Sequence, residues 1–294
     1  MKFFFALFKL IRITNLIIIF GTLALTYYCL NSSISLHDLF DLKFIFLCVS
    51  TVLTAASGYI INDYYDVKLD LINKPDEVIV GNIIPRRWAM LLHSTFIFIA
   101  VLLGFMINYK VGTSIIICST MLYLYSVNLK KMFLSGNILV SVLSAFVIML
   151  VWLFNKNIPV VFAIAYSAFA FMSSLIREII KDAEDIEGDR NYNCRTLPIV
   201  LGIEKTKQIL VYLNSIFIAL LFGYGIYIFG SDEIHSANSK FIYLIYILVA
   251  LIIPIIAMGF MITISKQKKD FSKLSSVIKF IMIAGILSML LLKI

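Results

Sequence analysis

Charged residues are scarce in this chain: Asp, Glu, Lys and Arg make up only 14% of its 294 residues. Ordinary soluble domains are about a quarter charged and about half apolar. Here 61% of the residues are hydrophobic, and the mean hydropathy is +0.98. A single soluble core of this size could not bury so many apolar side chains. The scarcity of charge therefore excludes an ordinary soluble fold and predicts that much of the surface contacts a lipid bilayer.

Cysteine and histidine are also rare, with four and three residues respectively. No two cysteines have the spacing of metal ligands, so we interpret them as small core residues rather than as a zinc site. The histidines lie far apart in the sequence and form no site. Long linkers and low-complexity segments are absent too, and a single domain spanning residues 1–294 is expected.

Long apolar runs, in contrast, are abundant. A helix needs about 20 apolar residues to cross the hydrocarbon core of a bilayer. The predicted fold class is therefore all-α, a polytopic membrane protein with about nine transmembrane helices. The predicted spans are roughly 11–30, 44–61, 88–107, 113–125, 138–154, 160–176, 209–229, 241–264 and 277–292.

The basic residues are distributed unevenly between the loops. With nine spans, 19 of the 25 Lys and Arg residues fall on the side of the N-terminal segment and five on the other side. Cytoplasmic loops carry such an excess of positive charge. We therefore predict a multi-pass protein of the cell inner (plasma) membrane with a cytoplasmic N-terminus. Because the net charge of +8 follows this topology pattern, nucleic acid is not expected as a partner.

Acidic residues are concentrated in two windows, residues 63–77 and 178–189, which hold 11 of the 17 Asp and Glu residues. These windows directly follow the second and the sixth predicted span, on the predicted cytoplasmic side. On a helix, the spacing i, i+3 and i+7 places three side chains on one face. This spacing occurs twice, in Asp63, Asp66 and Asp70 and again in Asp182, Asp185 and Asp189.

Carboxylates grouped in this way repel one another unless a cation offsets their charge. Mg²⁺ prefers oxygen ligands and typically bridges one or two carboxylates to the phosphates of a substrate. One such cluster alone would also fit a solvated acidic loop. Two clusters with matched spacing favour a Mg²⁺ site that holds a diphosphate.

Basic residues are interleaved with the carboxylates. Lys68 and Lys181 lie within the two acidic runs, and Arg177 precedes the second run. Positive charge beside bound Mg²⁺ would stabilise a departing diphosphate. Each of these residues also fits the general excess of positive charge in cytoplasmic loops. This interpretation is stronger for basic residues outside the acidic runs, such as Arg87.

Two motifs make a resemblance to a known family visible. Residues 62–70 read NDxxDxxxD, residues 185–189 read DxxxD, and Tyr125 and Lys130 lie between them. With nine predicted spans, the chain resembles the UbiA superfamily of intramembrane prenyltransferases over nearly its whole length. This resemblance implies facing helices around a central cavity, where Mg²⁺ binds the diphosphate of an isoprenyl donor.

The resemblance also implies roles for individual residues. The expected Mg²⁺ ligands are Asn62, Asp63, Asp66, Asp70, Asp182, Asp185 and Asp189. The expected catalytic residues are Asp66, Asp70, Lys68, Lys130, Lys181 and Tyr125. The residues expected to bind the substrates are Arg12, Asn15 and Arg177.

One motif departs from the family pattern. The family's tyrosine–lysine motif has three residues between its two members, whereas four separate Tyr125 from Lys130. Lys131 and Tyr123 therefore stay as alternatives for this element.

The acceptor is less well specified than the donor. Residues 177–198 look most like the branch of the family that uses geranylgeranylglyceryl phosphate. The expected reaction is Mg²⁺-dependent transfer of an isoprenyl group from an isoprenyl diphosphate to a lipophilic acceptor of this kind. An aromatic quinone precursor, of the 4-hydroxybenzoate or naphthoate type, is the alternative acceptor.

A secondary transporter is the alternative from a different class, because it also combines many spans with functional charges. Transporters place those charges near the bilayer midplane, whereas the carboxylates here cluster at the predicted cytoplasmic ends of helices. The phosphatidyl-transfer family also uses aspartates and Mg²⁺, but its DG and AR signature is missing around Asp63. Prenyl transfer is therefore the favoured function.

Overall fold

The computed structural model describes residues 2–31, 33–73, 75–192, 194–231 and 237–293, and no strand occurs within these ranges. In the described part of the chain, eight helices are long and apolar enough to cross a membrane. A ninth span is formed when the two bent N-terminal helices are counted as one. The predicted all-α membrane fold with about nine spans is confirmed.

The helices that form the spans follow one another with short connections. They are α2 (Ile13–Cys29), α3 (Leu42–Asn73), α4 (Arg86–Ile107), α5 (Tyr109–Val127), α6 (Ser135–Phe154), α7 (Val160–Glu184), α10 (Ile203–Gly230), α11 (Ala237–Tyr246) with α12 (Ile253–Ile264), and α13 (Lys268–Leu287). The shorter helices are α1 (Lys2–Leu10), η1 (Leu36–Phe40), η2 (Pro75–Glu77), η3 (Leu129–Lys131), α8 (Ile186–Asn191), α9 (Leu197–Leu201) and η5 (Ser288–Leu291), and the π-helix η4 (Ile247–Ile252) joins α11 to α12.

The first span is bent at its start. The axes of α1 and α2 differ by 56°, and Arg12 between them has the left-handed backbone angles φ 52° and ψ 57°. This conformation costs a non-glycine residue free energy and is often found at functional sites. It places Arg12 at the start of α2, beside the candidate site described below.

The helix that corresponds to the fourth predicted span, residues 113–125, is longer than the apolar run in the sequence. Helix α5 has 19 residues, because it begins in a polar stretch that the apolar pattern does not include. Asn108 caps this start, with its side chain accepting a hydrogen bond of 2.9 Å from the backbone N–H of Val111. Such a cap satisfies one of the free N–H groups at a helix start.

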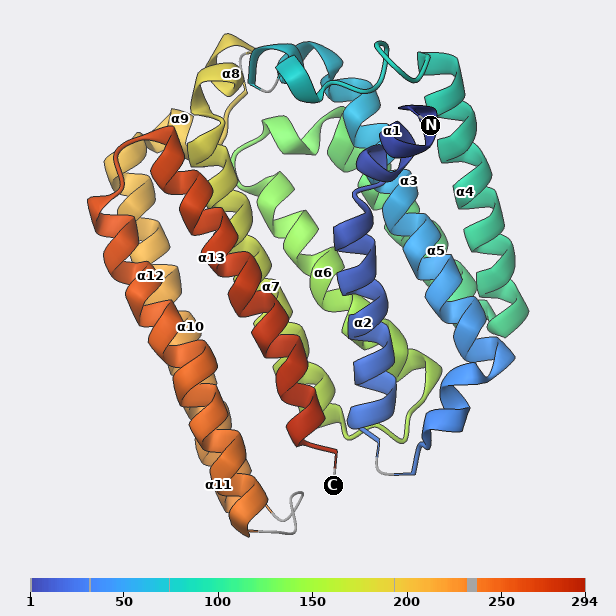
Figure 1. The fold of residues 1–294 in the computed structure, drawn as a ribbon, viewed down its shortest axis with the longest axis vertical. Coiled ribbons are helices and arrows are strands. Elements are labelled where there is room, and N and C mark those ends of the chain that lie inside the picture. The colour runs from blue at the N-terminus through green and yellow to red at the C-terminus, as the bar shows by residue number, and fades with distance from the viewer. Residues whose placement is uncertain (1, 32, 74, 193, 232–236, 294) are drawn as a thin grey trace.

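The bundle has two distinct ends (Figure 1). Helices α1, α8 and α9 lie at one end, and α11 and the C-terminal segment lie at the other. Within the bundle, α3 packs on α4 and α5, α7 packs on α6 and α13, and α10 packs on α12. Large apolar side chains cover the outer faces, for example Phe98, Phe222 and Phe260, which are 69%, 63% and 71% exposed. Lipid is the natural environment for such faces.

Candidate active site

Both acidic clusters open onto one cavity of about 400 Å³ inside the bundle. Helix α3 forms one wall, and the segment from α7 to α8 forms the facing wall. The predicted residues that line this cavity are Arg12, Asn15, Asn62, Asp66, Asp70, Tyr125, Lys130, Arg177, Lys181, Asp182, Asp185 and Asp189. Two predicted residues, Asp63 and Lys68, are not among those lining it.

The first cluster lies on a continuous helix. Helix α3 extends to Asn73, well past the apolar part of the predicted span. Successive residues of a helix are about 100° apart, so positions four or eight residues apart share a face. Asn62, Asp66 and Asp70 therefore point to the cavity together. Lys68 lies about 200° around the helix from Asp66, and its side chain is exposed. The structure does not bring Lys68 to the site.

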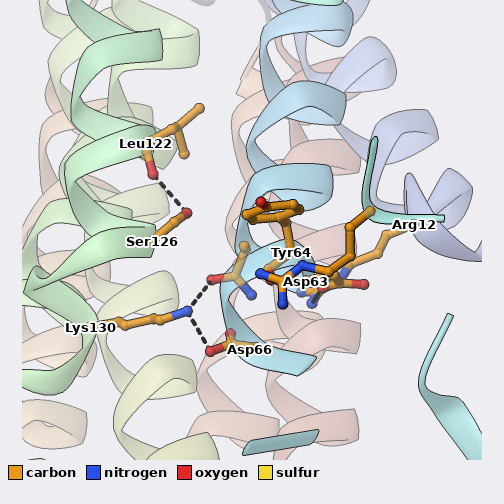
Figure 2. Close-up of polar contacts among 9 residues, drawn as sticks. Arg12, Asp63, Tyr64, Asp66, Leu122, Ser126 and Lys130 are labelled. Atoms are coloured by element: carbon orange, nitrogen blue, oxygen red, sulfur yellow. Dashed lines mark hydrogen bonds and ion pairs between the residues drawn. The ribbon is translucent and has the colours of Figure 1, made fainter. Parts of the chain in front are cut away.

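Asp63 lies at the edge of the cavity-facing side of α3 and contacts a different partner. Its carboxylate accepts a hydrogen bond of 3.0 Å from the guanidinium of Arg12. The same guanidinium lies 5.0 Å from the centre of the Tyr59 ring. Figure 2 shows Asp63 directed at Arg12, while Asp66 is directed at Lys130. The Asp63 carboxylate therefore positions the Arg12 guanidinium. A metal-binding role for Asp63 stays a prediction.

Lys130 forms a buried ion pair with Asp66. The two side chains are 9% and 11% exposed, and the Lys130 Nζ also lies 3.5 Å from the side-chain oxygen of Asn62 (Figure 2). Helix α5 ends at Val127, and the short helix η3 (Leu129–Lys131) carries Lys130 back over the cavity. This turn explains how four residues can separate Tyr125 from Lys130 while both line the same cavity.

The two alternatives for the tyrosine–lysine element lie in different places. Lys131 lines the cavity although its side chain is exposed. Tyr123 is exposed and its hydroxyl lies 3.2 Å from that of Tyr65. Tyr123 therefore lies outside the cavity, and Tyr125 is the tyrosine that faces the site.

The second cluster does not lie on one helix, and the prediction of a single helical face is wrong for it. Helix α7 ends at Glu184, Asp185 lies between the helices, and α8 begins at Ile186 and carries Asp189. Aspartate is common at helix ends because its side chain competes for backbone hydrogen bonds. All three aspartates nevertheless line the cavity, since the break turns α8 across its mouth.

Asp189 is buried, with 7% of its surface exposed. Burial, with a further contribution from the neighbouring Asp185 carboxylate, raises the pKa of Asp189 to about 6. Burial disfavours the ionised form of a carboxyl group, and a nearby cation favours it. A cation bound at this end of the cavity would therefore stabilise the ionised form of Asp189.

The donor set fits Mg²⁺ that is shared with a substrate. Among the described residues, no three His, Cys, Asp or Glu side chains converge closely enough to enclose an ion by themselves. Mg²⁺ is usually bound by only one or two carboxylates together with water and phosphate oxygens. Two facing walls that each present carboxylates match this mode of binding.

The model of the UbiA prenyltransferase family matches residues 16–284. The chain belongs to this family. It is 32% identical over 245 residues to the digeranylgeranylglyceryl phosphate synthase of Methanosphaera stadtmanae, covering 82% of this chain and 84% of that one. It is 33% identical over 261 residues to the synthase of the same name from Korarchaeum cryptofilum, covering 86% and 87%.

Solved structures with the same fold include other UbiA proteins. A structure of digeranylgeranylglyceryl phosphate synthase aligns over 100% of both chains with a TM-score of 0.71 and 25% identity. A UbiA homologue from Archaeoglobus fulgidus bound to GPP and Mg²⁺ aligns over 97% of this chain and 99% of that one, with a TM-score of 0.64 and 15% identity. Family membership confirms the predicted prenyltransferase class and excludes the transporter alternative.

Two site residues of this UbiA protein were not predicted from its sequence. Lys279 of α13 lines the cavity and donates a hydrogen bond of 3.3 Å to the side-chain oxygen of Asn15. Asn137, near the start of α6, donates a hydrogen bond of 2.8 Å to the carboxylate of Asp182. An ionisable residue inside an apolar span is a functional candidate in its own right, and that signal could have identified Lys279. No sequence signal distinguishes Asn137.

Proposed function

We propose that this UbiA protein transfers an isoprenyl group from an isoprenyl diphosphate to geranylgeranylglyceryl phosphate, in a Mg²⁺-dependent reaction. The observation that carries the proposal is the single cavity with carboxylates on two facing walls, lysines between them and an apolar interior. The named synthases that are 32% and 33% identical to this chain over most of its length support the choice of acceptor.

The diphosphate end of the donor is proposed to bind at the mouth of the cavity. Asn62, Asp66 and Asp70 on one wall and the three aspartates of the second cluster on the other would hold Mg²⁺ there. When bound, Mg²⁺ would neutralise the diphosphate and help it to leave. Lys130 and Lys181 line the same region, so their ammonium groups add positive charge where negative charge develops.

Transfer then requires that the allylic C1–O bond breaks and that C1 bonds to the hydroxyl oxygen of the acceptor, which loses its proton. The positive charge on C1 must be kept from water, because water would capture it. Below the polar mouth the cavity is lined by side chains such as Ile115, Leu143, Val147 and Phe169. Tyr125 lies near the boundary of the two zones, where its ring face can stabilise the allylic cation.

The phosphate of the acceptor is proposed to bind a second basic group, formed by Arg12, Arg177 and Lys279. All three line the cavity. Arg12 comes from the start of α2, Arg177 from α7 and Lys279 from α13. The Arg12 guanidinium is held by Asp63 and that of Arg177 by Glu178, each at 3.0 Å. An aromatic acid presents a single carboxylate to these cations, whereas a phosphate monoester carries more charge and more acceptor oxygens. This difference favours the lipid phosphate.

The protein is a multi-pass membrane protein, and we propose that the acidic mouth faces the cytoplasm. The bias of 19 basic residues to five supports this orientation. Labelling of single cysteines introduced at the exposed Lys68 and at the half-buried Lys240, which lie at opposite ends of the bundle, with a membrane-impermeant maleimide in intact cells would test it. Labelling at position 240 alone is expected, and labelling at position 68 alone would reverse the orientation.

The function is tested with purified protein in detergent. Geranylgeranyl diphosphate and Mg²⁺ would be offered with geranylgeranylglyceryl phosphate or with aromatic acids, and each reaction repeated with a chelator. The expected product is a doubly prenylated glyceryl phosphate that is lost on chelation. It is also lost in Asp185→Asn, whereas the matched control Glu187→Gln, which alters an exposed residue of α8, stays active. A prenylated aromatic product alone would refute the proposed acceptor.

A further inference from the structure

A second cavity adjoins the first within the bundle. Its volume is about 220 Å³, and it lies between α7, α10, α13 and the π-helix η4. Its lining is almost entirely apolar and includes Phe217, Leu221, Ile247 and Leu251. Ile164 and Leu220 also line it and are 56% and 46% exposed, so this cavity reaches the lipid-facing surface of the bundle.

Two side chains of α7, Tyr166 and Phe169, line both cavities. They therefore form the partition between them. The Tyr166 hydroxyl is fixed by the hydroxyls of Ser288 at 2.8 Å and Tyr243 at 3.1 Å. These groups have no charge and hydrogen-bond to one another, so the partition exposes little polarity to either cavity.

The other half of the partition depends on a glycine. A Cβ atom built on Gly285 of α13 would lie only 2.0 Å from the Cζ of Phe169, so the ring occupies space that any other residue at position 285 would take. The Phe169 ring also packs on Phe217, with 5.2 Å between the ring centres. The ring is thus held across the passage by its neighbours on α10 and α13.

The partition lies at a defined depth below the diphosphate site. Phe169 precedes Asp182 by 13 residues on the continuous helix α7, which corresponds to about 20 Å at about 1.5 Å per residue. An extended carbon chain advances about 1.2 Å per bond, so the four backbone bonds of an isoprene unit span about 5 Å. A chain of about four units, attached at the aspartates, therefore ends near Phe169.

We propose that the partition formed by Tyr166 and Phe169 limits the length of the donor's isoprenoid chain to about four units. The second cavity is the continuation that a longer chain would enter if the partition were removed. At roughly 30 Å³ per small group, the volume of a water molecule in the liquid, this cavity holds roughly seven carbon-sized groups, or about one further isoprene unit. This inference rests on the proposed function and adds a specificity-determining residue to it.

The test compares diphosphate donors of four and five isoprene units at a fixed, saturating acceptor concentration. In the unmodified protein the four-unit donor is expected to have the higher kcat/KM. In Phe169→Ala, the kcat/KM of the five-unit donor relative to the four-unit donor should rise at least about tenfold, the effect of about one or more methylene groups in an apolar pocket. Phe171→Ala is the matched control, because Phe171 is on the same helix and lines neither cavity. Its ratio should stay unchanged.

A second variant guards against misfolding of Phe169→Ala. Gly285→Ala must displace the Phe169 ring, so it should change the donor ratio on its own and have no further effect when combined with Phe169→Ala, as expected for two coupled residues. The proposal is overturned if the ratio changes in neither variant, or if it changes equally in Phe171→Ala.

A separate arm distinguishes the two isoprenoid chains of the reaction. The donor is kept at four units while the chain of the acceptor is lengthened by one unit. If Phe169→Ala improves the use of the longer acceptor and not of the longer donor, the assignment to the donor is refuted. If the unmodified protein transfers no chain to any acceptor, the proposed function fails together with this inference. Transfer with an unchanged donor ratio refutes only the inference.

Discussion

Replacement of Lys279 by methionine tests the proposed acceptor site most directly. Lys279 lies on α13 inside a membrane span, lines the cavity and contacts Asn15 at 3.3 Å. Arg177 lines the same cavity. The phosphate of the acceptor is proposed to bind to these two basic groups together with Arg12. Methionine keeps the length and the apolar stem of the lysine and removes only the charge.

The size of the effect follows from the lost interaction. A hydrogen bond to a charged group contributes about 1.5–3 kcal/mol, and about 1.4 kcal/mol corresponds to a factor of ten. Lys279→Met should therefore raise the KM for geranylgeranylglyceryl phosphate roughly 10- to 100-fold. The fold itself should not suffer, because a lysine within a span costs a few kcal/mol of insertion free energy that methionine avoids.

The assay measures KM for both substrates and for two acceptors, geranylgeranylglyceryl phosphate and the same lipid without its phosphate. The KM of the phosphate acceptor should rise, while that of the donor and the poor activity with the uncharged lipid should stay unchanged. Lys273→Met is the matched control, because Lys273 is an exposed lysine on the same helix. Equal losses with both acceptors, or a rise confined to the donor KM, would show that Lys279 does not bind the acceptor's phosphate.

Three further predictions concern the cation site. Asn137→Leu removes the 2.8 Å hydrogen bond to Asp182 and should weaken apparent Mg²⁺ affinity about 10- to 100-fold, as is typical for groups that orient a metal ligand; an unchanged Mg²⁺ titration would contradict this. Lys130→Met leaves the buried carboxylate of Asp66 without its ion-pair partner, so the melting temperature of the protein, measured in chelator, should fall. Added Mg²⁺ should raise the melting temperature of this variant by more than that of the unmodified protein. The pKa of Asp189 is raised to about 6, so protons compete with the cation below that pH. Mn²⁺ binding to donor-free protein should therefore weaken about fivefold from pH 6 to pH 5 and change little above pH 7.

The fold was largely predictable because the bilayer imposes a simple rule on the sequence. Each span needs a long apolar run, and each predicted run corresponds to an observed helix. The errors lie where polar residues extend or interrupt a helix. Helix α5 begins at Tyr109, outside the apolar run, and α7 breaks at Asp185, where spacing alone had suggested a continuous helix. Hydropathy carries little information at such points.

The site was predictable in composition but only partly in contacts. The motifs identified the aspartates because their spacing and its repetition can be read from the sequence, and the tyrosine–lysine motif identified Lys130. Lys68 lies within the first acidic run and was predicted for that reason, but it is on a face of α3 that does not line the cavity. Contacts between distant helices, such as Asn137 with Asp182 and Lys279 with Asn15, leave no spacing pattern. They depend on how the helices pack, which a single sequence does not specify.

The charge balance of the cavity explains why a cation should accompany the donor. The acidic and basic side chains that line the cavity are equal in number, so the lining is formally neutral. A diphosphate adds several negative charges to this formally neutral lining, so the total charge of the cavity becomes strongly negative unless a cation enters with the diphosphate. We therefore expect the donor to bind together with a cation, which the carboxylates of the two acidic clusters can hold. The cavity is lined, among the described residues, by the acids Asp66, Asp70, Glu178, Asp182, Asp185 and Asp189 and by the bases Arg12, Lys130, Lys131, Arg177, Lys181 and Lys279.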